Sequence, residues 1–269
     1  MSDARPARSH APPAAATLRV ATGARTDVGA VRSENQDALG VLPAVAVASG
    51  DVPGRTVPQP AVLVVADGMG GHEAGGEASD VAVDAVLGSF GPGFRRQPDR
   101  AALLRQALLA ANAAVWARAH SGPYPREMGT TCTTLLLSDG QAYLGHVGDS
   151  RAYRIRGEHV EQLTTDHTIG EAARHDPSLA SLAKTRGHHL TRAIGFRERV
   201  EVDARSAGPL LPGDRFLLCS DGLAPVGLDE IARAVHAYGP QEAADWLVAL
   251  ASTLGSRDNA TAVVVHIVP

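Results

Sequence analysis

Two patterns of apolar residues occur along this chain and predict strands and helices in separate blocks. The five apolar residues from Val62 to Ala66 indicate a buried strand. Similar runs predict further strands at 18–23, 38–48, 130–138, 141–147, 151–155, 160–163, 200–204, 215–220 and 262–268. Apolar positions at helical spacing predict helices at 77–90, 99–120, 169–175, 228–237 and 241–254. Because runs of strands separate blocks of helices, the pattern favours an α+β fold with mostly antiparallel sheets over a doubly wound parallel sheet.

Turn-forming residues suggest how some of these strands connect. The Asp-Gly pair at 139–140 separates two apolar runs and predicts a hairpin. The Gly-Asp-Ser sequence at 148–150 predicts a second short turn, so the strands on either side of it are also expected to pair antiparallel. Residues 49–60 are rich in Pro and Gly and predict a loop.

The domain organisation is expected to be simple. Residues 1–16 contain Ala, Pro, Arg and Ser without periodicity and predict a disordered N-terminal tail. Residues 17–269 are expected to form one domain. The irregular stretch 164–194 carries several histidines without metal-ligand spacing, and we expect it to be a surface flap with solvated histidines.

Composition narrows the class of protein. The 269 residues are 44% hydrophobic and 20% charged, which is ordinary for a globular domain. The net charge of −4 argues against a nucleic-acid-binding protein that works by bulk electrostatics. Cys132 and Cys219 lie in apolar runs and are expected to be core residues without a disulfide. No apolar run is long enough for a transmembrane helix and the start lacks the apolar segment of a signal peptide, so we expect a cytoplasmic location.

Aspartates recur at the ends of predicted strands. Asp67 follows one apolar run, Asp221 follows another, and Asp258 precedes a third. A single Asp-Gly pair is typical of a turn, but the recurrence suggests that these carboxylates converge on one point. Because like charges converge only around a cation, the pattern predicts a metal site.

The candidate ligands are all oxygen atoms. They are the carboxylates of Asp37, Asp67, Asp149, Asp221 and Asp258 and the carbonyl group of Gly68. Oxygen ligands suit Mg²⁺ or Mn²⁺, and several carboxylates suggest two ions that share one water, which makes hydroxide available to attack phosphorus. Arg32 would hold the phosphate oxygens. The leading class is therefore a metal-assisted hydrolase of an anionic ester, although Asp149 alone is also typical of a turn residue.

The chain also resembles a known family. Eight segments occur in order between about residue 18 and residue 268: TDVGAVRSENQD, VVADGMGGHEAGGEAS, MGTTCTTLLL, HVGDSRAYRIR, LTTDH, LTRAIG, LLCSDGL and GSRDNATAVVV. Together they resemble the bacterial metal-dependent serine/threonine protein phosphatases of type 2C (PPM family). The resemblance implies two antiparallel β-sheets packed face to face, flanked on both sides by helix pairs, with the flap at 164–194 beside the active site. It also implies hydrolysis of phosphoserine and phosphothreonine esters by a metal-bridging hydroxide.

The resemblance assigns roles by position. It implies that Asp67 bridges two metal ions and that Gly68 contributes its carbonyl group. Asp221 and Asp258 match the other ligands of the binuclear centre. The remaining matches are Asp37 at the second metal, Asp149 with Asp221 at a third and weaker site, Arg32 at the phosphate, and Asn259 as an orienting neighbour. The implied cofactors are two Mn²⁺ or Mg²⁺ ions per active site, with a third, weaker ion.

Two positions depart from the family pattern. Gln36 replaces the Glu of many members, and because Asp37 is intact we expect weaker metal binding at most. Met69 replaces the histidine that animal members use as a general acid, as it does in other bacterial members. His72 is the nearest substitute and could protonate the leaving oxygen. A substrate-contacting or solvent-facing His72 is the alternative.

Three functional hypotheses follow. The first is an active phosphatase whose partners are phosphorylated proteins, the substrates of a serine/threonine kinase, with no nucleic acid, no membrane and a monomeric state. The second is a non-catalytic module on the same fold that binds a phosphoprotein or a kinase; it is expected to have lost metal carboxylates. The third is a small-molecule phosphohydrolase, which would need a closed pocket.

Overall fold

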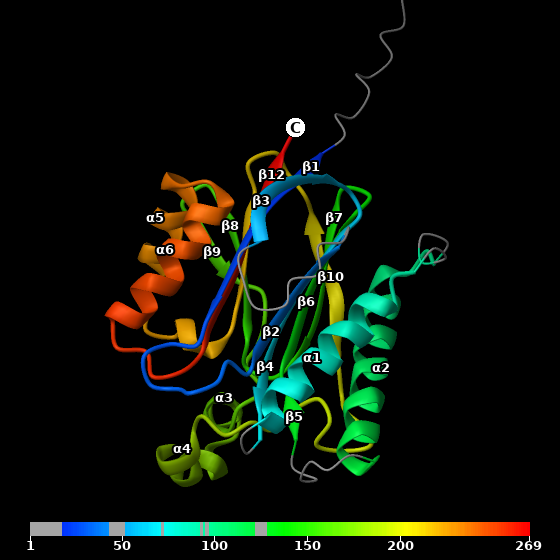
Figure 1. Ribbon diagram of the computed structural model, residues 1–269, viewed down its shortest axis with the longest axis vertical. Coiled ribbons are helices and arrows are strands. Elements are labelled where there is room, and N and C mark those ends of the chain that lie inside the picture. Colours follow the sequence, from blue (N-terminus) through cyan, green and yellow to red (C-terminus); the bar gives the residue numbers. More distant parts are fainter. Residues whose placement is uncertain (1–17, 43–51, 71–72, 92–93, 95–96, 122–127) are drawn as a thin grey trace, which may run out of the picture.

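The computed structural model of this chain describes residues 18–42, 52–70, 73–91, 94, 97–121 and 128–269. In this part of the chain, two antiparallel β-sheets pack face to face, and helices cover both outer faces (Figure 1). The α+β sandwich that the sequence and the family resemblance predicted is therefore confirmed. The predicted N-terminal tail and His72 lie outside the described residues.

Each sheet joins strands that are distant in the sequence. The order in the first sheet is β3 (Val52–Pro58), β1 (Arg19–Asp27), β12 (Ala260–Val268), β11 (Arg215–Cys219), β8 (Arg151–Arg156), β9 (His159–Gln162). The order in the second sheet is β10 (Asp203–Pro209), β7 (Gln141–Val147), β6 (Cys132–Ser138), β4 (Ala61–Met69), β2 (Asp37–Leu42), with β5 (Gly129–Thr130) paired to the end of β4.

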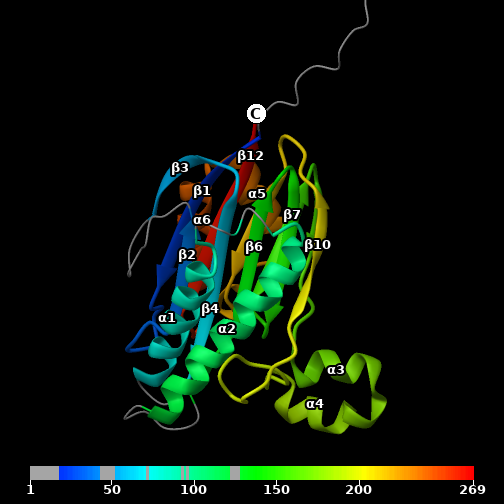
Figure 2. The same ribbon diagram turned by 90° about the vertical axis from the view of Figure 1, so that its right-hand side faces the viewer.

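The helices are arranged in pairs. α1 (Glu73–Gly88) and α2 (Arg100–Ser121) cover the second sheet, and α5 (Leu228–Ala237) and α6 (Pro240–Thr253) cover the first. Two short helices, α3 (Ile169–His175) and α4 (Ala180–Arg186), lie together at one end of the sandwich (Figure 2). None of the described helices combines the length and the apolar character that a membrane span requires.

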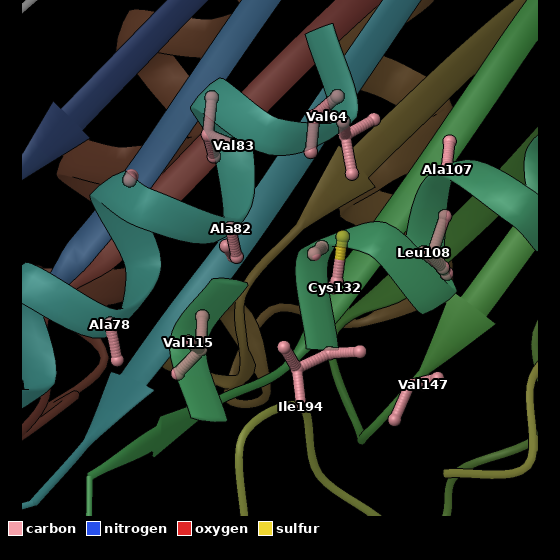
Figure 3. Packing of buried hydrophobic residues seen from close by; sticks show 14 of the residues in the cluster. Val64, Ala78, Ala82, Val83, Ala107, Leu108, Val115, Cys132, Val147 and Ile194 are labelled. Atoms are coloured by element: carbon pink, nitrogen blue, oxygen red, sulfur yellow. The ribbon is translucent and has the colours of Figure 1, made fainter. Parts of the chain in front are cut away.

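The continuous apolar run of β4 has a simple cause, because both of its faces are covered. Val62, Val64 and Ala66 belong to the core beneath α1 and α2. Ala61, Leu63 and Val65 belong to the core between the two sheets. Figure 3 shows part of the helix-covered core, to which Val64 of β4 and Ala82 and Val83 of α1 all belong. Since each fully buried aliphatic side chain stabilises the fold by about 1.5–3 kcal/mol, this burial fixes the strand between the two cores.

Several local predictions are confirmed. Asp139 and Gly140 both have positive φ, at 54° and 71°, which is the backbone of a tight hairpin turn between β6 and β7. The carboxylate of Asp99 accepts a hydrogen bond from the backbone N–H of Ala102 at 2.9 Å and so caps α2. Cys132 and Cys219 are buried and free.

Three predictions about the strands are wrong. Part of the predicted loop at 49–60 forms β3, an edge strand paired with β1. Prolines are tolerated in an edge strand because its outer edge donates no hydrogen bonds to another strand. The strand predicted at 200–204 begins later, as β10 at Asp203. β7 and β8 do not pair with each other, because the chain crosses at 148–150 from the second sheet to the first.

Candidate metal centre

Two of the predicted ligands lie side by side on neighbouring strands. Asp37 begins β2 and is paired with Asp67 of β4 in the antiparallel register. The backbone of Asp67 is held by two threonines: its N–H donates to Oγ1 of Thr131, and its carbonyl oxygen accepts from Oγ1 of Thr130, each at 2.9 Å. The strand does not stop at Asp67, as the sequence suggested, but continues to Met69 because β5 pairs with its end.

The other ligands come from the corresponding end of the first sheet and from the crossover. Asp221 follows β11 and Asp258 precedes β12, and these two strands are paired. Asp149 lies at the crossover between β7 and β8. A pocket of about 790 Å³ is lined by Asp67, Gly68, Asp149, Asp221 and Asp258 together with Arg32. Residues 188–193 line the same pocket, so the end of the predicted flap borders the acidic cluster.

The electrostatics of the cluster reflect crowded carboxylates. Burial, and then the neighbouring charges of Asp37 and Asp221, raise the pKa of Asp67 well above its ordinary value. Burial and the charge of Asp221 raise the pKa of Asp149 to about 7. Asp221 is exposed on the pocket wall, yet loss of hydration and the charge of Asp258 raise its pKa too. Without a cation to compensate their charge, these groups therefore hold their protons more tightly than ordinary carboxyl groups do.

Asp37 lies behind the pocket and is held by hydroxyl groups. Its Oδ2 accepts hydrogen bonds from Ser220 at 2.7 Å and from Thr261 at 2.6 Å. Its Oδ1 is buried without a hydrogen-bond partner among the described residues. Burial raises the pKa of Asp37 to about 7 in spite of the two hydroxyls, which lower it. An orphaned carboxylate oxygen near the carboxylates of Asp67, Asp221 and Asp258 is the kind of donor set that a hard divalent cation requires.

The carboxylates surround the pocket without forming a closed cage. Among the described residues, no three Asp, Glu, His or Cys side chains already meet around one point. The contacts explain the spacing, because Asp37 is turned towards two hydroxyls and Asp258 towards Arg32, while like charges repel. The residues present therefore fit divalent cations through their chemistry and their common pocket, and a bound cation would draw the side chains together.

Gly68 is required by close packing. A Cβ atom at this position would lie 2.0 Å from the carbonyl oxygen of Gly75 in the first turn of α1. The backbone N–H of Gly68 donates to the carbonyl oxygen of Gln36 at 3.0 Å. The glycines that follow Asp67 thus allow α1 to approach the strand next to the acidic cluster.

Arg32 lies on the loop between β1 and β2 and contacts the cluster directly. Its Nη2 donates to Oδ2 of Asp258 at 2.6 Å, and half of its side chain is exposed. Asn259 holds this loop with three hydrogen bonds of 2.9 Å. Its Nδ2 donates to the carbonyl oxygens of Val28 and Glu34, and its Oδ1 accepts from the N–H of Gln36. Asn259 therefore positions the segment that carries Arg32.

The crossover at Asp149 is stabilised by its neighbours. Gly148 has φ 115°, and its N–H donates to Nδ1 of His167 at 3.1 Å. The hydroxyls of Ser150 and Thr131 are 2.7 Å apart. Among the described residues, the carboxylate of Asp149 is hydrogen-bonded only by its own backbone, so it plays no part in this support. His167 is buried, which contradicts its prediction as a solvated histidine, whereas His175, His188 and His189 are exposed.

The sequence patterns did not point to the hydroxyl residues of the site. Thr131, Ser220 and Thr261 each hydrogen-bond to a predicted ligand or to its backbone. A signal was available, since all three lie within the quoted segments, next to or near the aspartates. The signal was weak because Ser and Thr are common in strands and turns.

Comparisons with known proteins show the family to which the chain belongs. The family model described as protein phosphatase 2C matches residues 33–264. The serine/threonine protein phosphatase PstP of Mycobacterium tuberculosis is 34% identical over 267 residues, which cover 94% of this chain but 46% of that protein. The chain thus spans about half the length of this relative. The serine/threonine phosphatase stp of Listeria monocytogenes is 31% identical over 255 residues, covering 90% of this chain and 94% of that protein.

Solved structures show the same similarity to bacterial serine/threonine phosphatases. The catalytic domain of PstP in complex with two manganese ions superposes with a TM-score of 0.75 at 33% identity, covering 94% of this chain and all (100%) of that one. The serine/threonine phosphatase Stp1 of Staphylococcus aureus superposes with a TM-score of 0.78 at 28% identity, covering 92% of this chain and 95% of that one. The chain therefore belongs to the protein phosphatase 2C family.

Proposed function

We propose that this chain is a metal-dependent protein phosphatase that hydrolyses phosphoserine and phosphothreonine esters. The observation that carries the proposal is that Asp67, Asp149, Asp221 and Asp258, from both sheets, line one pocket, and that Asp37 is paired with Asp67 on the neighbouring strand. Family membership supports a binuclear metal site and phosphoprotein substrates.

The chain's residues would hold two Mn²⁺ or Mg²⁺ ions. Asp67, Asp221 and Asp258 would be carboxylate ligands, with the carbonyl group of Gly68, while the free Oδ1 of Asp37 would contact the second ion directly or through water. Asp149 with Asp221 would form a third, weaker site. When bound, the metal ions lower the pKa of a water molecule and so supply hydroxide near neutral pH.

The remaining chemistry belongs to protein side chains. Arg32 lies at the edge of the acidic cluster, where its guanidinium group would hold two phosphate oxygens and orient the ester. Because phosphate is charged before as well as during the reaction, this contact would contribute mainly to substrate binding. We propose that His72 donates the proton to the leaving serine or threonine oxygen.

The test is release of phosphate from a phosphothreonine peptide, with and without Mn²⁺. We expect release that depends on Mn²⁺ and stops on addition of a chelator. The control is Asp67→Asn, which keeps the shape of the side chain but removes one charge from the cluster. If phosphate release in the chelated sample, or in the Asp67→Asn protein, equals that of the wild-type protein with Mn²⁺, the site is wrongly assigned.

The non-catalytic module is the alternative. It predicts the loss of at least one ligand carboxylate, whereas all five candidate aspartates are present and four of them line one pocket. A protein that binds phosphopeptide tightly but releases no phosphate with any divalent cation would favour this alternative.

A further inference from the structure

The pocket beside the acidic cluster has a second, basic part. It is formed by the end of the predicted flap and the segment that follows it, and it includes Arg192, Arg197 and Arg199. Arg192 is already neutralised, because its guanidinium lies 2.8 Å from Asp203 and 3.5 Å from Glu201. Arg197 and Arg199 are exposed, and neither forms an ion pair within the part of the chain that the structure describes. Two uncompensated cations therefore face the pocket.

The backbone that carries these two arginines is fixed. Asn112 of α2 is buried, and its Oδ1 accepts from the N–H of Gly195 at 2.8 Å. Its Nδ2 donates to the carbonyl oxygens of Arg197 and Glu198, both at 3.0 Å. A buried amide with all these bonds directed to one segment holds that segment in place. The arginines are thus presented from a supported backbone, with only their side chains free to adjust.

A chain of contacts connects the strand of Asp67 to the residue before Arg197. Met69, which ends the strand that carries Asp67, is paired with Gly129. The ring of Phe196 lies against Gly129 and is 45% exposed in the pocket. Arg197 follows directly. A substrate with its phosphate at the aspartates would therefore share this pocket with an aromatic surface and the two cations.

Arg32, not this pair, serves the phosphate-binding end of the pocket. The guanidinium of Arg32 donates to Asp258, one of the proposed metal ligands, at 2.6 Å. The pair at 197 and 199 is therefore available for a different anionic group.

We propose that Arg197 and Arg199 form a subsite for a second anionic group on the substrate peptide, either an acidic side chain or a second phosphate near the target residue. The inference rests on the proposed function, since it assumes a phosphopeptide substrate. It predicts that the enzyme prefers phosphopeptides with acidic or doubly phosphorylated surroundings. The preference should weaken at high salt because the subsite is exposed.

The test compares three phosphothreonine peptides that differ only around the target: neutral residues, Glu on both sides, or a second phosphothreonine. Their kcat/KM values are measured in the wild-type chain and in the double variant Arg197→Glu/Arg199→Glu. We expect the acidic-to-neutral ratio to fall about tenfold in the double variant, since each exposed charge contact has a modest effect. The doubly phosphorylated peptide separates a phosphate subsite from a carboxylate subsite.

Two controls make the result specific. Arg186→Glu reverses the same kind of charge on α4, but Arg186 does not line the pocket. This variant should therefore keep the wild-type acidic-to-neutral ratio. Arg197→Lys/Arg199→Lys keeps the charge and should retain most of the preference. A wild-type ratio near one, or an unchanged ratio in the charge-reversal variant, would overturn the inference.

Binding of non-hydrolysable phosphonate analogues of the same peptides gives a readout that needs no turnover. If the wild-type chain binds acidic analogues preferentially but hydrolyses none of the peptides, the proposed function fails while the subsite stands. If it hydrolyses all three peptides alike and binds their analogues alike, the subsite fails while the function stands.

Discussion

Replacing Asp149 with Asn should separate the stability of the fold from the activity of the site. Asp149 lies at the crossover between the sheets, but Gly148 and Ser150 hold that crossover through contacts with His167 and Thr131. The substitution removes a charge and leaves the shape of the side chain. We therefore expect normal folding, two tightly bound metal ions, and loss of most turnover. Activity should also require more Mn²⁺, because the weak third site is damaged.

The effect on stability can be worked out from the pKa of Asp149. Burial and Asp221 raise this pKa from the ordinary 3.8 to about 7, so the folded chain holds the proton more tightly than the unfolded chain. The metal-free wild-type protein therefore loses stability as pH rises from about 4 to about 7, and the loss is complete above that range. About three pKa units correspond to at most about 4 kcal/mol. Because the carboxylate borders an open pocket, screening should reduce this to about 1–2 kcal/mol.

The assay has two parts. Urea unfolding in a chelator, at pH 4 and pH 8, should show Asp149→Asn equal to wild type at pH 4 and more stable at pH 8. A Mn²⁺ titration of activity, with calorimetric counting of bound ions, then tests the third site. If the variant matches wild type in activity and in Mn²⁺ dependence, Asp149 is a turn residue. If it is less stable at pH 8, the like-charge interpretation is wrong.

Three further predictions concern neighbouring residues. Asp67→Asn should abolish turnover. Its circular dichroism spectrum should be unchanged, because the substitution removes a like charge from a crowded cluster. Near wild-type phosphate release would contradict the binuclear assignment. Arg32→Ala should mainly raise KM, and steady-state kinetics that show a pure loss of kcat would mean that its role is misassigned. Asn259→Ala should destabilise the fold by about 2–4 kcal/mol in urea unfolding, because three partly buried hydrogen bonds are lost, and should raise KM by loosening the Arg32 loop. An Asn259→Ala protein with wild-type stability and KM would refute that role.

Local patterns predicted five of the six described α-helices and missed only α4 within the predicted flap. The segments predicted at 169–175 and 228–237 coincide with α3 and α5, and Pro240 begins α6 as expected. Helical spacing, caps and breakers are properties of neighbouring residues, so they can be recognised without the fold. Asp139-Gly140 was predictable for the same reason, since the turn depends on two adjacent residues.

Strand pairing required the tertiary structure. The Pro-rich sequence of β3 gives little local signal, and only its position at the edge beside β1 makes it a strand. The short connection at 148–150 suggested a hairpin, but β8 pairs with β11 and β9 in the other sheet. Hydrogen bonds between strands depend on partners that are distant in sequence, and nothing local specifies them.

In the functional site, too, some features could be predicted from the sequence and others required the tertiary structure. The sequence identified aspartates because each stands at the end of an apolar strand, and the family resemblance ordered them. Only the fold showed that Asp37 is buried against Ser220 and Thr261, and that Asn112 supports the backbone of Arg197. The type of a side chain tells which chemistry it can perform. Its partner and its exposure come from chain segments brought together by packing, and these decide which chemistry is used.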